Sequence, residues 1–313
     1  MRALITGGNG FVGLHLTEAL RAAGHETIVA GRPRDGGEVD VALDMLDLDG
    51  LRRIVREARA DTVFHLAAQS FVPDATSDPL GTYDVNVLGT ARLYEALRSL
   101  PEPKPRVIVT SSGEVYGARD ASELPLRETA AVRPITPYAA SKASAEAIAL
   151  ASGRTFGIPT IVTRAFNHIG PGQSERFAVA SFARGLAEIA AGSAPILAVG
   201  NLTTQRDFLD VRDVVTAYVA LATNGVAGEI YNVASGRAVT IQEVLRQLIM
   251  IARVPVEVRE DPARLRPSDV PVAYGDSAKL RAATGWEPQF TLARSLRDVY
   301  DDARARLAVA SAP

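Results

Sequence analysis

The chain begins with a glycine-rich turn that lies between a short apolar run, residues 3–5, and a helical pattern of apolar residues at 14–20. Gly7 permits a tight turn, Gly10 lets the backbone approach a pyrophosphate, and Gly13 lets the helix pack on the strand. The helix would then direct its N-terminal amides at the phosphates. The stretch therefore predicts a dinucleotide-binding fold, with cofactor contacts at Gly7, Gly10, Phe11, Val12 and Gly13.

Strand-like and helical patterns alternate regularly as far as residue 165. We expect strands at 27–30, 39–43, 62–68, 106–110 and 160–164, with helices at 51–58, 78–100 and 138–156. This alternation is typical of an α/β fold with a doubly wound parallel sheet, the Rossmann fold.

The pattern loosens after residue 165. Loops rich in glycine, proline and arginine separate helical stretches near 177–191, 211–222, 241–251 and 292–307. We expect residues 1–165 to form the dinucleotide-binding domain, joined by a returning segment near 205–225. Residues 166–313 should form mainly a smaller, mainly helical, interwoven substrate-binding lobe.

The composition excludes several classes of function. The 313 residues are 47% hydrophobic and 22% charged, and the net charge of −2 offers no general attraction to nucleic acid or to membranes. The chain has no cysteine, which fits a cytoplasmic location, and its first strand starts too early for a signal peptide. No apolar run reaches membrane-spanning length, and the four histidines are scattered, so we predict no membrane partner and no metal site.

The end of the second strand indicates which cofactor is used. It leads to Arg32 and Arg34, and an arginine suits the 2′-phosphate of NADP, whereas an acid would suit the ribose of NAD. We favour NADP(H) with Arg32 as the contact, and NAD(H) stays possible because Asp35 follows closely.

The third and fourth strands predict further cofactor contacts. Asp44 and Met45 follow the third strand, where Asp44 is equally suited to bind an adenine amino group or to cap a turn. Leu66, Ala67 and Ala68 form a small-residue exit from the fourth strand, against which a cofactor can lie.

The stretch Pro137-Tyr138-Ala139-Ala140-Ser141-Lys142 is the strongest indication of catalysis. A helix places Tyr138 and Lys142 on one face, and a neighbouring ammonium favours the phenolate and so makes the hydroxyl a better acid–base group. The fifth strand delivers Ser112 and Glu114 to the carboxyl edge of the sheet, where ligands bind in such folds. We predict Ser112, Glu114, Tyr138 and Lys142 as the catalytic residues.

Three other residues have a structural interpretation. We expect His65 to be packed rather than catalytic and Asn86 to brace neighbouring strand ends, because a buried amide needs partners. Trp286 is expected to anchor packing rather than to contact a ligand.

The chain resembles the extended short-chain dehydrogenase/reductase family of nucleotide-sugar enzymes nearly from end to end. The matching motifs are GGNGFVG, HLAA, NVLGT, SSGEVYG, YAASK and Thr284-Gly285-Trp286-Glu287-Pro288. Within the family, residues 164–173, 199–202, 206–213 and 264–268 are most similar to reductases of GDP-linked 4-keto-6-deoxy sugars. GDP-mannose 4,6-dehydratases are similar too.

The resemblance implies roles for individual residues. Tyr138 would be the proton donor, Lys142 would hold the nicotinamide ribose, and Ser112 would bind the sugar carbonyl oxygen. The nucleotide diphosphate would be contacted by Asn167, Arg206 and Arg266, and arginine is physically suited to this. The alternative for the two arginines is ion pairing with Asp207, Asp210 or Asp269.

Reduction and dehydration use the same hydride machinery, but a dehydratase also needs a base and gains from a second acid. Glu114 is a candidate base, whereas Gly113, where sugar dehydratases often carry Asp or Ser, can donate no side-chain proton. We therefore favour NADPH-dependent reduction, with dehydration or epimerisation as the alternative and a non-catalytic NADP-sensing regulator as a remote one.

The partners expected are a nucleotide sugar, with a GDP-linked one favoured, and a second copy of the chain. Relatives often dimerise through the helices that match residues 78–100 and 138–156. The second of these helices carries many alanines, which would allow close helix packing.

Overall fold

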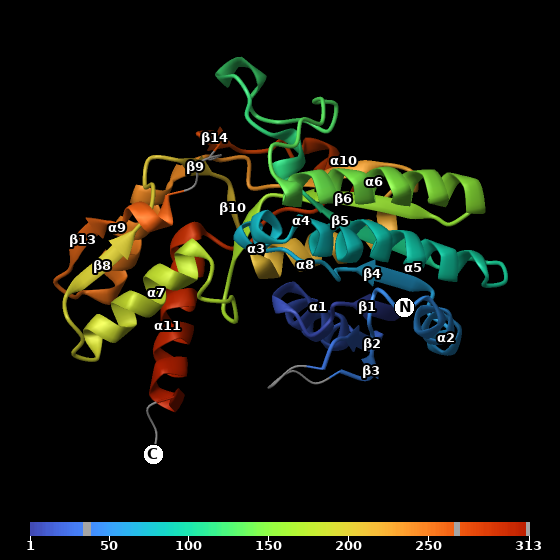
Figure 1. The fold of residues 1–313 in the computed structure, drawn as a ribbon, viewed down its shortest axis with the longest axis horizontal. Coiled ribbons are helices and arrows are strands. Elements are labelled where there is room, and N and C mark those ends of the chain that lie inside the picture. The colour runs from blue at the N-terminus through green and yellow to red at the C-terminus, as the bar shows by residue number, and fades with distance from the viewer. Residues whose placement is uncertain (34–38, 266–269, 311–313) are drawn as a thin grey trace.

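The computed structural model describes residues 1–33, 39–265 and 270–310, and Figure 1 shows a sheet-centred part beside a smaller lobe. The central sheet has seven strands, β1 (Arg2–Thr6), β2 (Glu26–Gly31), β3 (Val41–Ala42), β4 (Thr62–His65), β5 (Arg106–Ser112), β6 (Thr160–Ala165) and β11 (Ile230–Val233). Their order is β11-β6-β5-β4-β1-β2-β3, and every neighbouring pair is parallel. The expected doubly wound parallel sheet is confirmed.

Helices cover both faces of this sheet. One apolar core joins the sheet to α1 (Phe11–Ala22), α8 (Val211–Asn224) and α10 (Ala278–Thr284). The other core joins it to α2 (Leu48–Ala58), α5 (Gly89–Arg98) and α6 (Pro137–Phe156). Trp286 is buried in the first core, so the packing role expected for it is confirmed.

Several predicted boundaries were wrong. The strand expected at 39–43 is reduced to Val41–Ala42, at the edge of the sheet. The strand expected at 62–68 ends at His65, because its partner β1 ends at Thr6 where the glycine turn begins. The seventh strand, β11, was not expected, and it extends the sheet beyond β6.

The helix expected over 78–100 is interrupted. It consists of α4 (Pro79–Tyr83), a π-helical turn η1 (Asp84–Leu88) and α5, and a short helix α3 (Val72–Ser77) precedes it. π-turns inside helices occur frequently at functional sites. This one contains Asn86, whose side chain is buried.

The smaller lobe is built on α7 (Ala178–Ala190), α9 (Ile241–Ala252) and α11 (Leu292–Ala310), which share one apolar core. The helices expected there are confirmed. The lobe also holds small sheets that were not expected. They pair β8 (Ile196–Val199) with β13 (Glu257–Glu260), β7 (Asn167–Ile169) with β10 (Phe208–Asp210), and β9 (Gln205–Arg206) with β12 (Val239–Thr240) and β14 (Val272–Ala273). The domain division at residue 165 stays a prediction.

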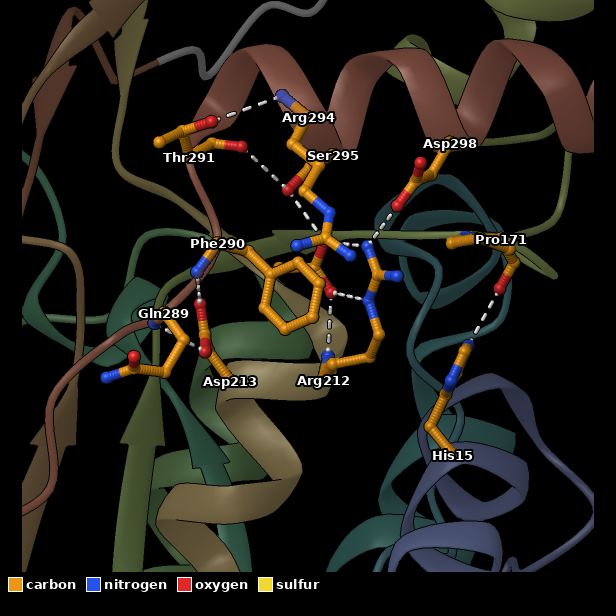
Figure 2. Close-up of polar contacts among 11 residues, drawn as sticks. His15, Pro171, Arg212, Asp213, Gln289, Phe290, Thr291, Arg294, Ser295 and Asp298 are labelled. Carbon is orange, nitrogen blue, oxygen red and sulfur yellow. Dashed lines mark hydrogen bonds and ion pairs between the residues drawn. The ribbon is translucent and has the colours of Figure 1, made fainter.

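The start of α8 ties the two parts together, as Figure 2 shows. Arg212 donates to Asp210 at 2.8 and 2.7 Å and to Asp298 of α11 at 2.6 Å. Ser295 of α11 donates its hydroxyl to Asp210 at 2.6 Å. Asp213 accepts the backbone amides of residues 289 and 290 at 2.8 and 3.0 Å. These contacts fix the smaller lobe beside the carboxyl edge of the sheet.

Candidate active site

The predicted catalytic residues meet at the carboxyl edge of β5. Ser112 ends β5, and a 3₁₀ turn η2 (Gly113–Tyr116) follows it directly. Thr136 precedes α6 as its N-cap, and its side chain accepts the amide of Ala139 at 3.1 Å. Its first turn places Tyr138 and Lys142 on the buried face, as their spacing of four residues predicts.

The environment of the Tyr138 hydroxyl favours its protonated form. Burial raises its pKa well above the usual value and the charge of Glu114 raises it further, whereas a hydrogen bond with the Ser112 side chain lowers it. The pKa shift expected from the sequence was therefore wrong in direction, because burial is the largest influence on this phenol. A protonated Tyr138 is a proton donor at neutral pH.

Lys142 is held against the sheet. Its Nζ donates to the carbonyl oxygen of Thr110 on β5 at 2.7 Å, and only 6% of the residue is exposed. Burial lowers the pKa of Lys142 to about 8, and the charge of Glu146 opposes that shift. The ammonium therefore loses its proton within the range of ordinary assays.

His65 lies beneath the same edge and links two strands to a helix. Its Nδ1 lies 2.8 Å from the Thr6 hydroxyl and its Nε2 lies 3.0 Å from the Thr90 hydroxyl. Burial, and then the charge of Lys142, lower the pKa of His65 to about 3. His65 is a neutral packing residue, as expected.

Asn86 braces the loop after β4. Its side chain accepts the amide of Gln69 at 2.7 Å, and it donates to the Gln69 carbonyl and the Ser141 hydroxyl, both at 2.9 Å. The expectation that Asn86 has a bracing role is confirmed, and one of its partners lies between Tyr138 and Lys142 on α6.

The glycine turn forms a cradle that side chains would fill. Gly7 has a φ of +71°, and a Cβ there would lie 2.7 Å from the amide nitrogen of Ala67. A Cβ on Gly13 would lie 2.5 Å from the Gly8 carbonyl oxygen. Gly10 precedes α1 as its N-cap and has no side chain to cap the helix. The amides of Phe11 and Val12, at the start of the helix, therefore receive no side-chain hydrogen bond from the N-cap residue. This geometry fits the phosphates of a dinucleotide.

The residues predicted around the adenosine end lie beside this turn. Arg32 is about half exposed and pairs with Asp44 at 3.3 Å, and Asp44 also accepts the amide of Leu46 at 3.0 Å. Asp44 thus caps a turn, one of its two expected roles. Asn9, which was not singled out from the sequence, donates to the carbonyl of Arg32 at 2.6 Å and fixes its position. Arg34 lies outside the described residues.

The other predicted cofactor contacts differ in which of their atoms a ligand can reach. The side chain of Met45 is buried in the core against Gly89, which leaves its backbone as the part that a ligand can contact. Leu66, Ala67 and Ala68 are half-buried at the exit of β4, and the backbone of Ala67 closes on Gly7. Whether these residues bind a cofactor stays a prediction.

The predicted diphosphate contacts lie on the smaller lobe. Asn167 is exposed on β7, and Arg206 on β9 donates to the carbonyls of Gln205 and Val270 at 2.9 and 2.6 Å. Asp207 binds Ser235, Gly236 and the amide of Gly275, and Asp210 binds Arg212 and Ser295. Arg266 and Asp269 lie outside the described residues.

Two groups of residues near the site were missed in the sequence. A buried ion pair joins Glu146 of α6 to Arg164 of β6, and a charged residue inside a strand of apolar neighbours was a signal for it. Across the two parts, Arg176 pairs with Asp74 and its guanidinium lies 4.0 Å from the ring centre of Phe71. These contacts join the loop before α7 to α3 and to its N-cap residue Phe71.

Two absences concern the described residues only. Within 1–33, 39–265 and 270–310, no group of three or more His, Cys, Asp or Glu side chains could hold a metal ion. No helix in this part of the chain has both the length and the apolar character needed to cross a membrane.

Comparisons with known proteins agree with this geometry. The family model described as GDP-mannose 4,6 dehydratase matches residues 4–299. The chain is 40% identical over 307 residues, 98% of both chains, to the GDP-6-deoxy-D-mannose reductase of Pseudomonas aeruginosa. It is similar in structure to RMD from Pseudomonas aeruginosa complexed with NADPH, with a TM-score of 0.87 and 39% identity over 98% of this chain and 100% of that one. UDP-glucose 4-epimerase from Thermus thermophilus, in complex with NAD, has a TM-score of 0.87 and 32% identity over 97% of this chain and 99% of that one.

The buried His65 generates a prediction about acid stability. Its pKa is about 3 in the fold against the ordinary value of 6.5 in an unfolded chain, so between these values only the unfolded chain binds the proton. The free energy of unfolding should therefore fall as pH drops below the unfolded pKa, by about 2 kcal/mol at about pH 5. His65→Gln should remove this part of the pH dependence, which denaturant unfolding at neutral and acid pH measures. His25→Gln, a half-buried histidine beside the N-terminal amine, is the control. Equal pH slopes for wild type and His65→Gln would contradict the prediction.

Proposed function

The chain belongs to the GDP-mannose 4,6-dehydratase family of extended short-chain dehydrogenases/reductases, and from this premise we propose that it reduces GDP-4-keto-6-deoxy-D-mannose at C4. NADPH is the hydride donor, and the product is GDP-D-rhamnose or its C4 epimer, GDP-6-deoxy-talose. The identity to a GDP-6-deoxy-D-mannose reductase supports the GDP-linked substrate, and the NADPH complex of the similar structure supports the cofactor. NAD is the second choice, because other structural neighbours hold it.

The observation that carries the proposal is the buried, protonated hydroxyl of Tyr138 beside the side chain of Ser112. Reduction of a ketone needs a proton donor at the carbonyl oxygen, whereas dehydration begins with oxidation of an alcohol and needs a base there. Next to Ser112, Gly113 has no side chain, and a Cβ there would lie 3.0 Å from the ring of Phe166. The ring occupies the space that a second acid would need.

The dinucleotide fits the turn between β1 and α1. The amides of Phe11 and Val12 would face the diphosphate, and Gly7, Gly10 and Gly13 keep this turn free of side chains. Arg32 binds the 2′-phosphate in exchange for its exposed pair with Asp44, since guanidinium and phosphate form strong forked hydrogen bonds. The adenosine and nicotinamide sides of the cofactor are lined by Asp44, Met45, Leu66, Ala67 and Ala68.

The side chains of the chain then divide the work of the reduction. Ser112 donates a hydrogen bond to the C4 carbonyl oxygen and polarises it. Bound NADPH supplies the hydride that arrives at C4. Tyr138 gives its proton to the oxygen, so that the ketone becomes an alcohol, and it regains a proton from solvent. Lys142 holds the nicotinamide ribose and stabilises the phenolate that Tyr138 briefly forms. Glu114 orients the sugar.

The nucleotide diphosphate lies between the two parts of the chain. Asn167 on β7 and Arg206 on β9 are proposed to bind the diphosphate together with Arg266. An arginine suits this role because its guanidinium is always charged and forked.

Incubation with two candidate substrates tests the function. With GDP-4-keto-6-deoxy-D-mannose and NADPH, purified protein should oxidise NADPH and form a GDP-6-deoxyhexose. With GDP-mannose alone, no keto sugar should appear. Formation of the keto sugar without added reductant would replace reduction by dehydration, with Glu114 as the base. Binding of NADP without turnover on any nucleotide sugar would favour a regulator.

Tyr138→Phe should bind NADPH normally but lose turnover by about 10²–10⁴-fold, because it can no longer supply the proton. Cofactor binding by fluorescence and steady-state rates measure the two effects. Tyr83→Phe, on α4, is the control. Near-full activity of Tyr138→Phe would remove this residue from the mechanism.

Arg32→Ser should weaken NADPH binding by about tenfold to a hundredfold and leave NADH binding nearly unchanged, because only NADPH carries the 2′-phosphate. Titration of both cofactors measures the ratio. Arg53→Ser, an exposed arginine of α2, should change neither affinity. Equal losses for both cofactors would show that Arg32 does not read the 2′-phosphate.

We also propose a cytoplasmic homodimer. The surface of α4 and η1 exposes Leu80 and Leu88, by 76% and 46%, and α6 exposes the small side chains of Ala147 and Ala151. Apolar side chains on adjoining helices suit close packing of two copies. A monomeric mass by light scattering would contradict the dimer.

A further inference from the structure

A buried ion pair lies one helical turn beyond Lys142. Arg164 of β6 donates from Nε and from its terminal nitrogen to the two carboxylate oxygens of Glu146, at 2.9 and 2.7 Å. The exposed fractions of the two side chains are 4% and 6%. The guanidinium also lies 4.8 Å from the ring centre of Tyr116. Such a pair costs much desolvation, so its presence in a core calls for a reason beyond stability.

The pair continues a row of contacts between α6 and the sheet. Lys142 donates to the carbonyl of Thr110 on β5, and Glu146, four residues further along α6, binds Arg164 on β6. The two strands are neighbours, with residue 110 opposite 163 and 111 opposite 164. The helix is therefore fixed to the sheet at two points one turn apart, and the first of them is a predicted catalytic residue.

We propose that Glu146, held by Arg164, is a positioning residue that keeps Lys142 charged and in place against the sheet edge. The importance of Glu146 for the reaction rests on the proposed function of Lys142. The effect of Glu146 on the protonation of Lys142 is independent of that function. A carboxylate at i+4 lies on the same helix face as the ammonium, which suits it to favour the protonated form.

The other groups around Lys142 do not replace Glu146. His65, from β4, is neutral across the range in which the lysine titrates, because its pKa is about 3. Burial raises the pKa of Tyr138, on the same helix, and of Tyr218, from α8, so both phenols are neutral there as well. Glu114, from η2, acts on Tyr138, and Glu146 is the charged group that raises the pKa of Lys142 against its burial.

The small number of lysines in the chain allows the Lys142 ammonium to be followed by NMR. The sequence contains three lysines, Lys104, Lys142 and Lys279. Protein labelled with ¹³Cε-lysine therefore gives three side-chain signals, and the one that Lys142→Met removes belongs to Lys142. A pH titration of this signal in the ligand-free chain reads the pKa of Lys142 without any substrate.

Glu146→Gln is the decisive variant, because it keeps the shape and removes the charge. The wild-type Lys142 signal should titrate near pH 8, and the variant signal should titrate about one unit lower. Asp298→Asn, which removes a carboxylate from the ion pair with Arg212, should leave the Lys142 titration unchanged. An unchanged titration in Glu146→Gln would overturn the proposal, since a merely structural role would lower stability without moving the lysine.

A second variant keeps the test decisive if Glu146→Gln fails to fold with Arg164 left uncompensated. Glu146→Gln/Arg164→Gln removes both charges and lets two amides bond. Glu146 but not Arg164 shifts the pKa of Lys142, so the Lys142 signal should also titrate below that of wild type. An unchanged value there would equally overturn the proposal.

An activity measurement separates the proposal from the function on which it draws. If the chain is the reductase, the alkaline decline of kcat/KM should move to lower pH in Glu146→Gln by the same shift as the NMR signal. A shifted NMR titration without any reductase activity would reject the proposed function and leave the effect of Glu146 intact. A shifted titration with an unchanged activity profile would reject the part of the proposal that connects Glu146 to the reaction.

Discussion

The fixing of α6 across the carboxyl edge of the central sheet is the constraint on which the rest of the structure depends. Ser141 of α6 binds Asn86, Lys142 binds the Thr110 carbonyl and Glu146 binds Arg164, so consecutive turns of one helix are tied to three other elements. Without these contacts a helix rich in alanine would have few side chains to define its position on the sheet. Because they are polar and directional, they set rotation and register, which apolar packing alone specifies less sharply.

Burial decides which protonation states this edge holds. It keeps the phenol of Tyr138 neutral, since the phenolate would lose its hydration, and it brings the ammonium of Lys142 close to neutrality. Tyr138 is therefore present in its protonated form. This is the form that reduction of a ketone uses, because negative charge develops on the substrate oxygen and is quenched by the nearest acid.

The sequence predicted what depends on local pattern and failed where tertiary context decides. The glycine turn, the strand–helix alternation and the spacing of Tyr138 and Lys142 are local, and the expected sheet and shared helix face followed from them. The pKa of Tyr138 was predicted in the wrong direction. A spacing of four residues indicates a shared helix face, but it does not indicate how deeply that face is buried. The strands β9, β12 and β14 have two residues each, too few to show a period. The π-turn around Asn86, whose side chain accepts the amide of Gln69, has no sign in the sequence pattern.

The aspartates of residues 206–213 show why charge patterns alone do not identify a binding site. From the sequence, Asp207 and Asp210 competed with phosphate as partners for the neighbouring arginines. In the fold Asp207 is fully buried and holds the amides of Ser235, Gly236 and Gly275, while Asp210 joins α8 to α11 through Arg212 and Ser295. These carboxylates are occupied in connecting the two parts of the chain, and moving them would leave buried donors unpaired. The two carboxylates that competed with phosphate in the sequence therefore have structural roles. Asp207 holds the segment after β11, and Asp210 holds α11 at the start of α8.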